Sequence, residues 1–183
     1  MDGIFNFALS PRKNLGFPLS YEKQDNRFLF FHALASGTEN SVPLRIINDP
    51  SIWEIDENAL SRTFRVIGSR SIQTPAEAMD SSGNLFFVLV NPMALVCWDS
   101  STPYTIDNIK VIYRNDETLQ FASGVKIVRN AMGMEELWVI TNRFQRVYTG
   151  KMDLSEVNFR IQTNTVAEML KGSSSCNADK PIF

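Results

Sequence analysis

Hydrophobic and polar residues alternate along this chain in a pattern that returns about every fifty residues. Three strongly apolar runs mark the repeat, and they are centred on Phe30, Phe86 and Trp138. Each run is almost continuously apolar, as expected for a β-strand that is buried on both faces of its sheet. Shorter segments flank each run, and the last of them in each unit alternates polar and apolar residues, which predicts an outer strand half exposed to water.

The pattern predicts four strands in each unit, namely one before the apolar run, the run itself, and two after it. The predicted strands are 5–11, 27–34, 42–47 and 63–67 in the first unit, 76–83, 84–90, 94–98 and 109–113 in the second, and 123–128, 136–141, 145–149 and 157–161 in the third.

Four strands followed by a restart are typical of the blades of a β-propeller. We therefore predict an all-β protein with about three four-stranded blades. Closed propellers usually have about four to eight blades, so three would leave two apolar sheet faces exposed to water. The chain is then about half of a closed propeller, and the missing blades would precede Met1. The alternative is a stand-alone β-sandwich, in which the repeat would be a coincidence.

Composition and charge narrow the possible functions. Hydrophobic residues make up 44% of the chain, which favours a packed core over disorder. Eighteen Lys and Arg stand against 20 Asp and Glu, so the basic excess that phosphate contacts require is missing and no nucleic-acid partner is expected. No apolar run approaches the roughly 20 residues of a membrane span, so no membrane partner is expected either.

The N-terminus and the cysteines leave alternatives open. Met1 is followed by Asp2 and Gly3 rather than by a basic and then apolar signal segment, which predicts either a cytosolic chain or a fragment of a longer one. Cys97 and Cys176 cannot form a CxxC metal site. They are either two free thiols or one disulfide, and the disulfide would require an oxidising compartment.

The sequence resembles the C-terminal half of the insect yellow and major royal jelly protein family. The resemblance runs along nearly the whole chain and is carried by Gly3-Ile4-Phe5, Ala8-Leu9-Ser10-Pro11, Phe30-Phe31-His32-Ala33-Leu34-Ala35-Ser36, Ala78-Met79-Asp80, Gly83-Asn84-Leu85-Phe86-Phe87, Cys97-Trp98-Asp99, Leu119-Gln120-Phe121-Ala122-Ser123-Gly124, Glu136-Leu137-Trp138, Thr141-Asn142-Arg143-Phe144-Gln145 and Glu156-Val157-Asn158-Phe159-Arg160-Ile161.

The resemblance implies a secreted six-bladed propeller about twice this length. On that basis residues 1–163 would be blades of a partial domain, and residues 164–183 would be a tail anchored by a Cys97–Cys176 disulfide. It implies three possible functions. The protein would bind a small aromatic amine or catechol-derived ligand in melanin-related pigmentation, or isomerise dopachrome in melanin formation, or act as a cuticle or nutritive protein without a ligand.

A ligand would sit at the mouth of the propeller channel, where the innermost strands begin and where the loops between second and third strands lie. Aromatic rings suit a planar amine, and a carboxylate or a ring face suits its ammonium group. The residues predicted to bind such a ligand are Asn142, Phe144, Phe121, Ala122 and Glu77, and family members that bind amines resemble this chain at Asn142 and Phe144. The alternative for Phe121 and Phe144 is ordinary packing within the blade.

An isomerase needs a group that moves a proton, and His32 is the only histidine. It lies inside an apolar strand, which favours a structural role, so no catalytic residue is assigned. No Cys, His, Asp or Glu group has metal-ligand spacing, and neither a metal nor a cofactor is expected. The adjacent carboxylates Glu135 and Glu136 are expected in a solvated turn.

Overall fold

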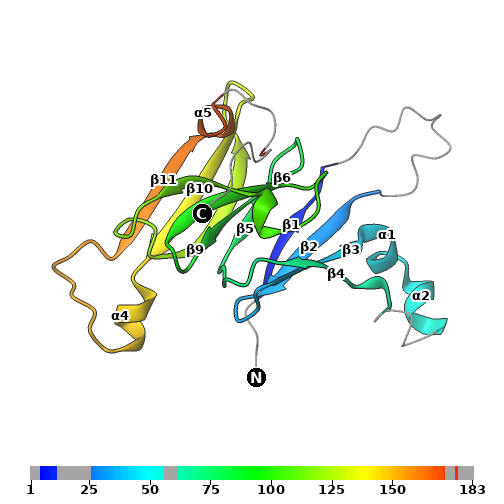
Figure 1. The fold of residues 1–183 in the computed structure, drawn as a ribbon, viewed down its shortest axis with the longest axis horizontal. Helices are drawn as coiled ribbons and strands as arrows, with labels where there is room; N and C mark the ends of the chain where they lie inside the picture. The colour runs from blue at the N-terminus through cyan, green and yellow to red at the C-terminus, as the bar shows by residue number, and fades with distance from the viewer. Residues whose placement is uncertain (1–4, 12–25, 56–61, 172–175, 177–183) are drawn as a thin grey trace.

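The structure is a computed structural model that describes residues 5–11, 26–55, 62–171 and 176. It is an all-β protein with three antiparallel sheets and a few short helices (Figure 1). The first sheet has four strands in chain order, β1 (Phe5–Leu9), β2 (Phe28–Ala33), β3 (Thr38–Pro43) and β4 (Arg65–Ser69). The middle sheet also has four, β5 (Glu77–Met79), β6 (Asn84–Leu89), β7 (Ala94–Asp99) and β8 (Ile109–Arg114). The third sheet has three, β9 (Phe121–Arg129), β10 (Glu135–Asn142) and β11 (Phe159–Thr165).

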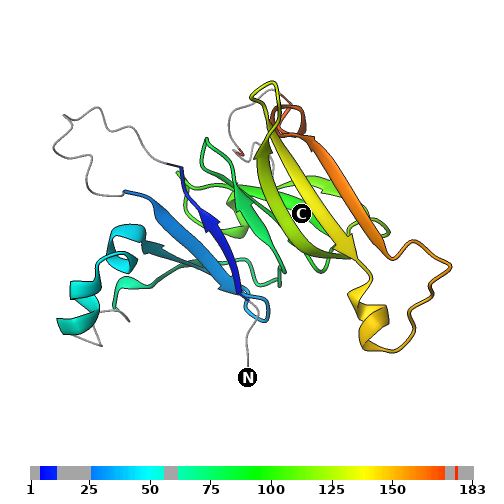
Figure 2. The same ribbon diagram turned by 180° about the vertical axis from the view of Figure 1, so that it is seen from behind.

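The three sheets lie side by side and diverge from a common inner end, as Figures 1 and 2 show from opposite sides. The first strand of each sheet lies at the inner end, where β1 contacts β5 and β5 contacts β9. Every strand pairs with its sequence neighbour, so each sheet folds from one continuous segment. The fold therefore confirms three repeated sheet units in the order that the sequence predicted.

Two apolar cores join the three sheets, one on each face of the middle sheet. Phe87, Leu89 and Val96 face the first sheet, where they pack with Ala8 and Phe30. On the other face the core contains Phe86, Val88, Leu95, Cys97, Leu119, Ala122, Leu137, Val139, Val166, Leu170 and Cys176. Because full burial of a large apolar side chain contributes about 1.5–3 kcal/mol, these two interfaces are the main source of stability.

The first and third sheets are apolar on their other faces as well, and those faces are exposed. In β2 and β10 buried positions alternate with more exposed ones, whereas every residue of β6 and β7 is buried. The exposed large residues include Phe7, Leu9 and Val66 on the first sheet, and Trp138, Ile140, Phe159 and Ile161 on the third.

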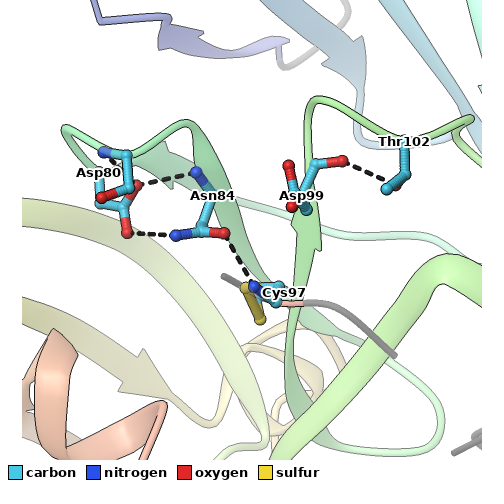
Figure 3. Close-up of a disulfide and its surroundings, with 7 residues drawn as sticks. Asp80, Asn84, Cys97, Asp99 and Thr102 are labelled. Atoms are coloured by element: carbon cyan, nitrogen blue, oxygen red, sulfur yellow. Dashed lines mark hydrogen bonds between the residues drawn. A yellow bond between two sulfur atoms is a disulfide. The ribbon is translucent and has the colours of Figure 1, made fainter. Parts of the chain in front are cut away.

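A disulfide between Cys97 on β7 and Cys176 connects the end of the chain to the middle sheet (Figure 3). The backbone N–H of Cys176 donates to the side-chain oxygen of Asn84 at 2.9 Å. The amide of Asn84 is itself held by the carboxylate of Asp80, which accepts bonds from both its side-chain and its backbone nitrogen at 2.8 Å. The pairing that the family resemblance implied is thus present.

The predicted strand 42–47 is wrong in position. The third strand of the first sheet is β3, which begins at Thr38 and ends at Pro43, and Leu44–Ile47 form the short helix α1. β2 begins at Phe28, which pairs with Pro43, and the ladder ends there with the hydrogen bond that the backbone N–H of Leu44 donates to the carbonyl oxygen of Arg27. Proline also lacks the N–H that a central strand would use. A second short helix, α2 (Pro50–Ile55), follows.

The predicted strand 145–149 is also wrong, because this segment is the helix α4 (Phe144–Tyr148). Gly150 ends it at φ 66°, and the backbone N–H groups of Gly150 and Lys151 close the last turn by bonding to Val147 and Arg146. β11 takes the vacant place and pairs directly with β10, so the third unit has three strands rather than four.

Several smaller predictions have clear outcomes. Trp98 packs between the first and middle sheets against Phe30 and Tyr104, whereas Trp138 lies on the exposed face of the third sheet. Glu135 and Glu136 begin strand β10 rather than lying in a turn. The short helix α5 (Val166–Met169) is capped by the hydroxyl of Thr165, and the short helix η1 (Ile106–Asn108) precedes β8.

Among the described residues, no helix has the length and apolar character needed to cross a membrane. Asp2 and Gly3 lie outside the described residues.

Candidate functional sites

Two aromatic rings stack at one end of the third sheet. Phe121 begins β9 and Phe144 begins α4, and their ring centroids lie 4.9 Å apart with an angle of 29° between the planes. Phe144 keeps 45% of its surface exposed, so the pair offers a ring to solvent instead of closing into a core. Tyr148, one helical turn further along, lies 6.3 Å from Phe144.

Asn142 stands beside this aromatic pair and carries an unused acceptor. It pairs with Phe121 across the β9–β10 ladder, and alternation along β10 puts it on the same face as the exposed Ile140 and Trp138. Its side-chain oxygen is buried and accepts no hydrogen bond from any residue that the structure describes. Since buried acceptors are normally satisfied, this oxygen is suited to a donor supplied by a ligand or by a covering element.

The other two predicted ligand residues lie elsewhere. Ala122 is fully buried in the core between the middle and third sheets, so its side chain faces away from the stacked rings. Glu77 is buried at the start of β5 and its carboxylate lies 3.1 Å from Nδ1 of His32. The structure therefore brings together Phe121, Asn142 and Phe144, and it gives Ala122 and Glu77 different surroundings. The binding role itself stays a prediction for all five residues.

A buried cluster of charged residues joins the first and middle sheets at Glu77. His32 comes from β2, Glu39 from β3 and Glu77 from β5, and all three side chains are fully enclosed. The Nδ1 atom of His32 lies 3.0 Å from the Oε2 atom of Glu39, and Nε2 of the ring donates to the carbonyl oxygen of Thr74 at 3.0 Å. Both ring nitrogens are therefore engaged, and no face of the imidazole is open to a substrate.

Arg70 completes the cluster from the segment after β4. Its guanidinium donates to Glu39 at 3.0 Å and to the hydroxyl oxygen of Tyr104 at 3.1 Å. The same guanidinium lies 5.7 Å from the centre of the Phe87 ring, within the range of a cation–π interaction. Two carboxylates thus face two groups that can be cationic, which lowers the cost of burying charge.

The surroundings shift the pKa values in this cluster strongly. Burial alone would lower the pKa of His32, but its hydrogen bond to Glu39, its close contact with Glu77 and the charges of both carboxylates outweigh burial and raise the pKa to about 9. Burial raises the pKa of the Glu77 carboxyl to about 7, against the opposing pull of His32. Burial likewise raises the pKa of the Tyr104 hydroxyl above its usual range.

Sequence reasoning singled out His32 and Glu77 separately and missed that they meet; it placed Glu39 only in a loop at the predicted channel mouth, and it missed Arg70. The separations explain this, because Glu39 is 7 residues from His32, Arg70 is 31 from Glu39, and Thr74 is 42 from His32. Such spacings match no local motif. The only sequence signal was the presence of polar residues at buried positions of apolar strands.

The fold and these sites define an all-β protein made of repeated antiparallel sheets. A stacked pair of aromatic rings lies at the end of the third sheet, and a buried ionic cluster lies between the first and middle sheets. A family model described as "Major royal jelly protein" matches residues 2–175. The chain belongs to the major royal jelly protein family, which includes proteins named yellow.

Three relatives illustrate this membership. The chain is 28% identical to "Dopaminechrome tautomerase" of Drosophila melanogaster over 98% of its own length and 37% of the relative. It is 30% identical to "Major royal jelly protein 9" of Apis mellifera over 92% of the chain and 40% of the relative. It is 29% identical to "Protein yellow" of Drosophila melanogaster over 94% of the chain and 29% of the relative. The chain therefore spans well under half the length of these relatives.

Proposed function

We propose that this chain supplies about half of a six-bladed propeller, and that the complete protein binds a small aromatic amine or catechol-derived ligand at the channel mouth. The observation that carries the proposal is the stacked Phe121–Phe144 pair beside the unpartnered oxygen of Asn142. A flat ring can stack on the exposed face of Phe144, and an ammonium or hydroxyl group can donate to Asn142.

The position of Phe121, Phe144 and Asn142 supports the idea that this chain supplies only part of the binding site. Asn142 lies on the exposed face of the third sheet together with Trp138 and Ile140. In a closed ring a further blade would cover this face, so the ligand would be held between the two. The missing N-terminal blades of the same protein are then a partner of this chain, and residues 1–163 are the part that joins them in one domain.

We also propose secretion and a role in pigmentation. The Cys97–Cys176 disulfide supports an oxidising compartment, because cytosolic thiols are normally kept reduced. The role in pigmentation rests on the names of the relatives, one a dopaminechrome tautomerase and another a yellow protein.

Calorimetry of the full-length protein with dopamine and serotonin tests the binding proposal. We expect Phe144→Ala to weaken amine binding about 10-fold, since a stacked aromatic pair contributes about 0.5–1.5 kcal/mol beyond the area that it buries. Tyr148→Ala is the matched control, because it removes an aromatic residue that is 83% exposed on the same helix, and it should leave affinity unchanged. No binding heat with either amine would contradict the proposal and favour a cuticle or nutritive protein.

A dopachrome isomerase is the second candidate, favoured by the relative named "Dopaminechrome tautomerase". The loss of dopachrome absorbance with time measures it directly. His32→Gln should leave any such activity within about 2-fold provided the protein folds, because the imidazole is enclosed and a general base must reach its substrate. A large loss of rate in a folded His32→Gln protein would show that the enclosed cluster takes part in the reaction.

A further inference from the structure

Three atoms that can coordinate a metal ion lie close together inside the buried cluster. They come from three strands of two sheets. Nδ1 of His32 lies 3.0 Å from Oε2 of Glu39 and 3.1 Å from Oε2 of Glu77, and all three donor atoms lie within 4.8 Å of one another. A tetrahedral ion with bonds of about 2.0–2.2 Å separates its ligands by about 3.3 Å, so each carboxylate oxygen needs to move away from Nδ1 by only a few tenths of an ångström to hold one.

The neighbours of these donors are those that a metal site requires. Nε2 of His32 donates to the carbonyl oxygen of Thr74, so the proton of a neutral ring stays on Nε2 and the lone pair of Nδ1 points at the carboxylates. Arg70 donates to Glu39 at 3.0 Å and fixes the position of that carboxylate. Backbone carbonyls behind ligating histidines, and hydrogen bonds to ligating carboxylates, are the usual means of orienting ligands.

The cluster also has more acceptors than donors. Both oxygens of Glu77 and Oε1 of Glu39 accept no hydrogen bond from any residue that the structure describes, and the charge of His32 is the close partner of Glu77. A single Nδ1 proton lies between two carboxylates and cannot satisfy both. Buried carboxylate oxygens without donors are costly, and a cation at their centre removes that cost.

We propose that His32, Glu39 and Glu77 form a structural site for a divalent transition-metal ion of the zinc class, which joins the first and middle sheets. One imidazole and two carboxylates suit such an ion, whereas Ca²⁺ would need about six to eight oxygen ligands. A water molecule would take the fourth position, as in other sites with three protein ligands. When the ion binds, the bond to Nδ1 replaces the Nδ1–H bond, and that proton is released to solvent. Because the site is enclosed, the ion stabilises the fold and meets no substrate.

The test uses the full-length protein at pH 8, from which a chelator first removes any metal and to which Zn²⁺ is then added. We expect it to take up one Zn²⁺ per chain, measured by mass spectrometry of the metal, and its melting temperature to rise by several degrees. Glu77→Gln should weaken Zn²⁺ binding at least about 100-fold, since loss of an outer partner alone costs about 10–100-fold. Asp80→Asn is the matched control, because Asp80 is an equally buried carboxylate outside the cluster, and it should keep one ion per chain.

Co²⁺ provides a measurement on the unaltered protein, which decides the matter even if Glu77→Gln fails to fold. A Co²⁺ ion held by one nitrogen and carboxylate oxygens in tetrahedral geometry gives visible absorption bands far stronger than those of the hydrated ion. Their appearance at one equivalent, and their loss on adding Zn²⁺, would support the site. The proposal is overturned if the protein takes up less than about 0.1 equivalent of either metal, or if folded Glu77→Gln binds Zn²⁺ as tightly as the unaltered protein.

Discussion

The middle sheet and its two neighbours have similar sequences but different environments. Every residue of β6 and β7 is buried, and strands β2 and β10, which also carry an apolar run, alternate between buried and more exposed positions. The difference lies in what covers them, because the middle sheet has a sheet on each face, and the first and third sheets have one on a single face. Burial here depends on the neighbours of a strand more than on its own composition.

The contrast is sharpest between two phenylalanines. Phe86 is fully buried, and Phe7 on the outer face of the first sheet is 59% exposed. Because a monomeric protein seldom leaves an extended apolar face in water, the two outer faces are best understood as halves of interfaces. This agrees with the proposal that further blades pack against them.

The largest effect is expected from a matched pair of substitutions across this contrast. Phe86→Ala should lower the free energy of unfolding by about 3–5 kcal/mol, since it removes a buried ring and leaves a cavity. Phe7→Ala in the same 183-residue chain should change it by less than about 0.5 kcal/mol, as is usual for exposed positions. Urea unfolding followed by tryptophan fluorescence measures both, and similar losses from the two would show that the outer face is covered.

The disulfide fixes the chain end to the middle sheet, and its loss should have the next largest effect. Replacing both Cys97 and Cys176 with Ala should cost about 3–4 kcal/mol, because the bridge closes a loop with a separation of 79 residues. Thermal melts with and without a reducing agent provide the measurement. An unchanged melting temperature under reducing conditions would mean that the bridge adds nothing to the core around it.

The buried cluster makes the junction of the first and middle sheets sensitive to pH when a chelator is present. Since the pKa of His32 is raised from 6.5 to about 9, its contribution is complete below pH 6.5 and is lost as the pH rises through about 9. That loss amounts to about 3 kcal/mol. The raised pKa of Glu77 acts in the same direction at lower pH. Folded His32→Gln protein should show a flatter profile of stability between pH 6.5 and 9, and a slope equal to that of the unaltered protein would contradict this account.

The smallest effect in the 183-residue chain separates an exposed face from an unfinished interface. Ile161→Thr on the third sheet, at a position 66% exposed, should change the stability of this chain by less than about 0.5 kcal/mol. In the full-length protein the same change should cost more than about 1 kcal/mol, because a covering blade would bury the side chain. Melting both proteins side by side checks this, and equal small changes would argue against a covering blade.

The sequence by itself determined which segments form most of the strands. The continuous apolar run from Leu85 to Leu89 predicted a strand buried on both faces, and the structure has β6 there. The turn before this strand contains Gly83, whose φ of 90° favours glycine. These features follow from local periodicity and backbone preferences, which a short stretch of chain carries in full.

Local pattern failed at 42–47 and 145–149, because a five- or six-residue segment of mixed apolar and polar residues fits a strand or a short helix equally well. The choice depended on whether a partner strand was within reach, which Phe28 and β11 decided from elsewhere in the chain. The stacked Phe121–Phe144 pair was partly foreseen, because each residue lies near a predicted strand end.

Only the tertiary structure decided that His32, Glu39, Arg70 and Glu77 meet in one enclosed cluster. No periodicity links residues that come from three strands and a connecting segment, because their contact depends on how two sheets pack. Burial and mutual charge then set the pKa values, and neither quantity exists until that packing has formed.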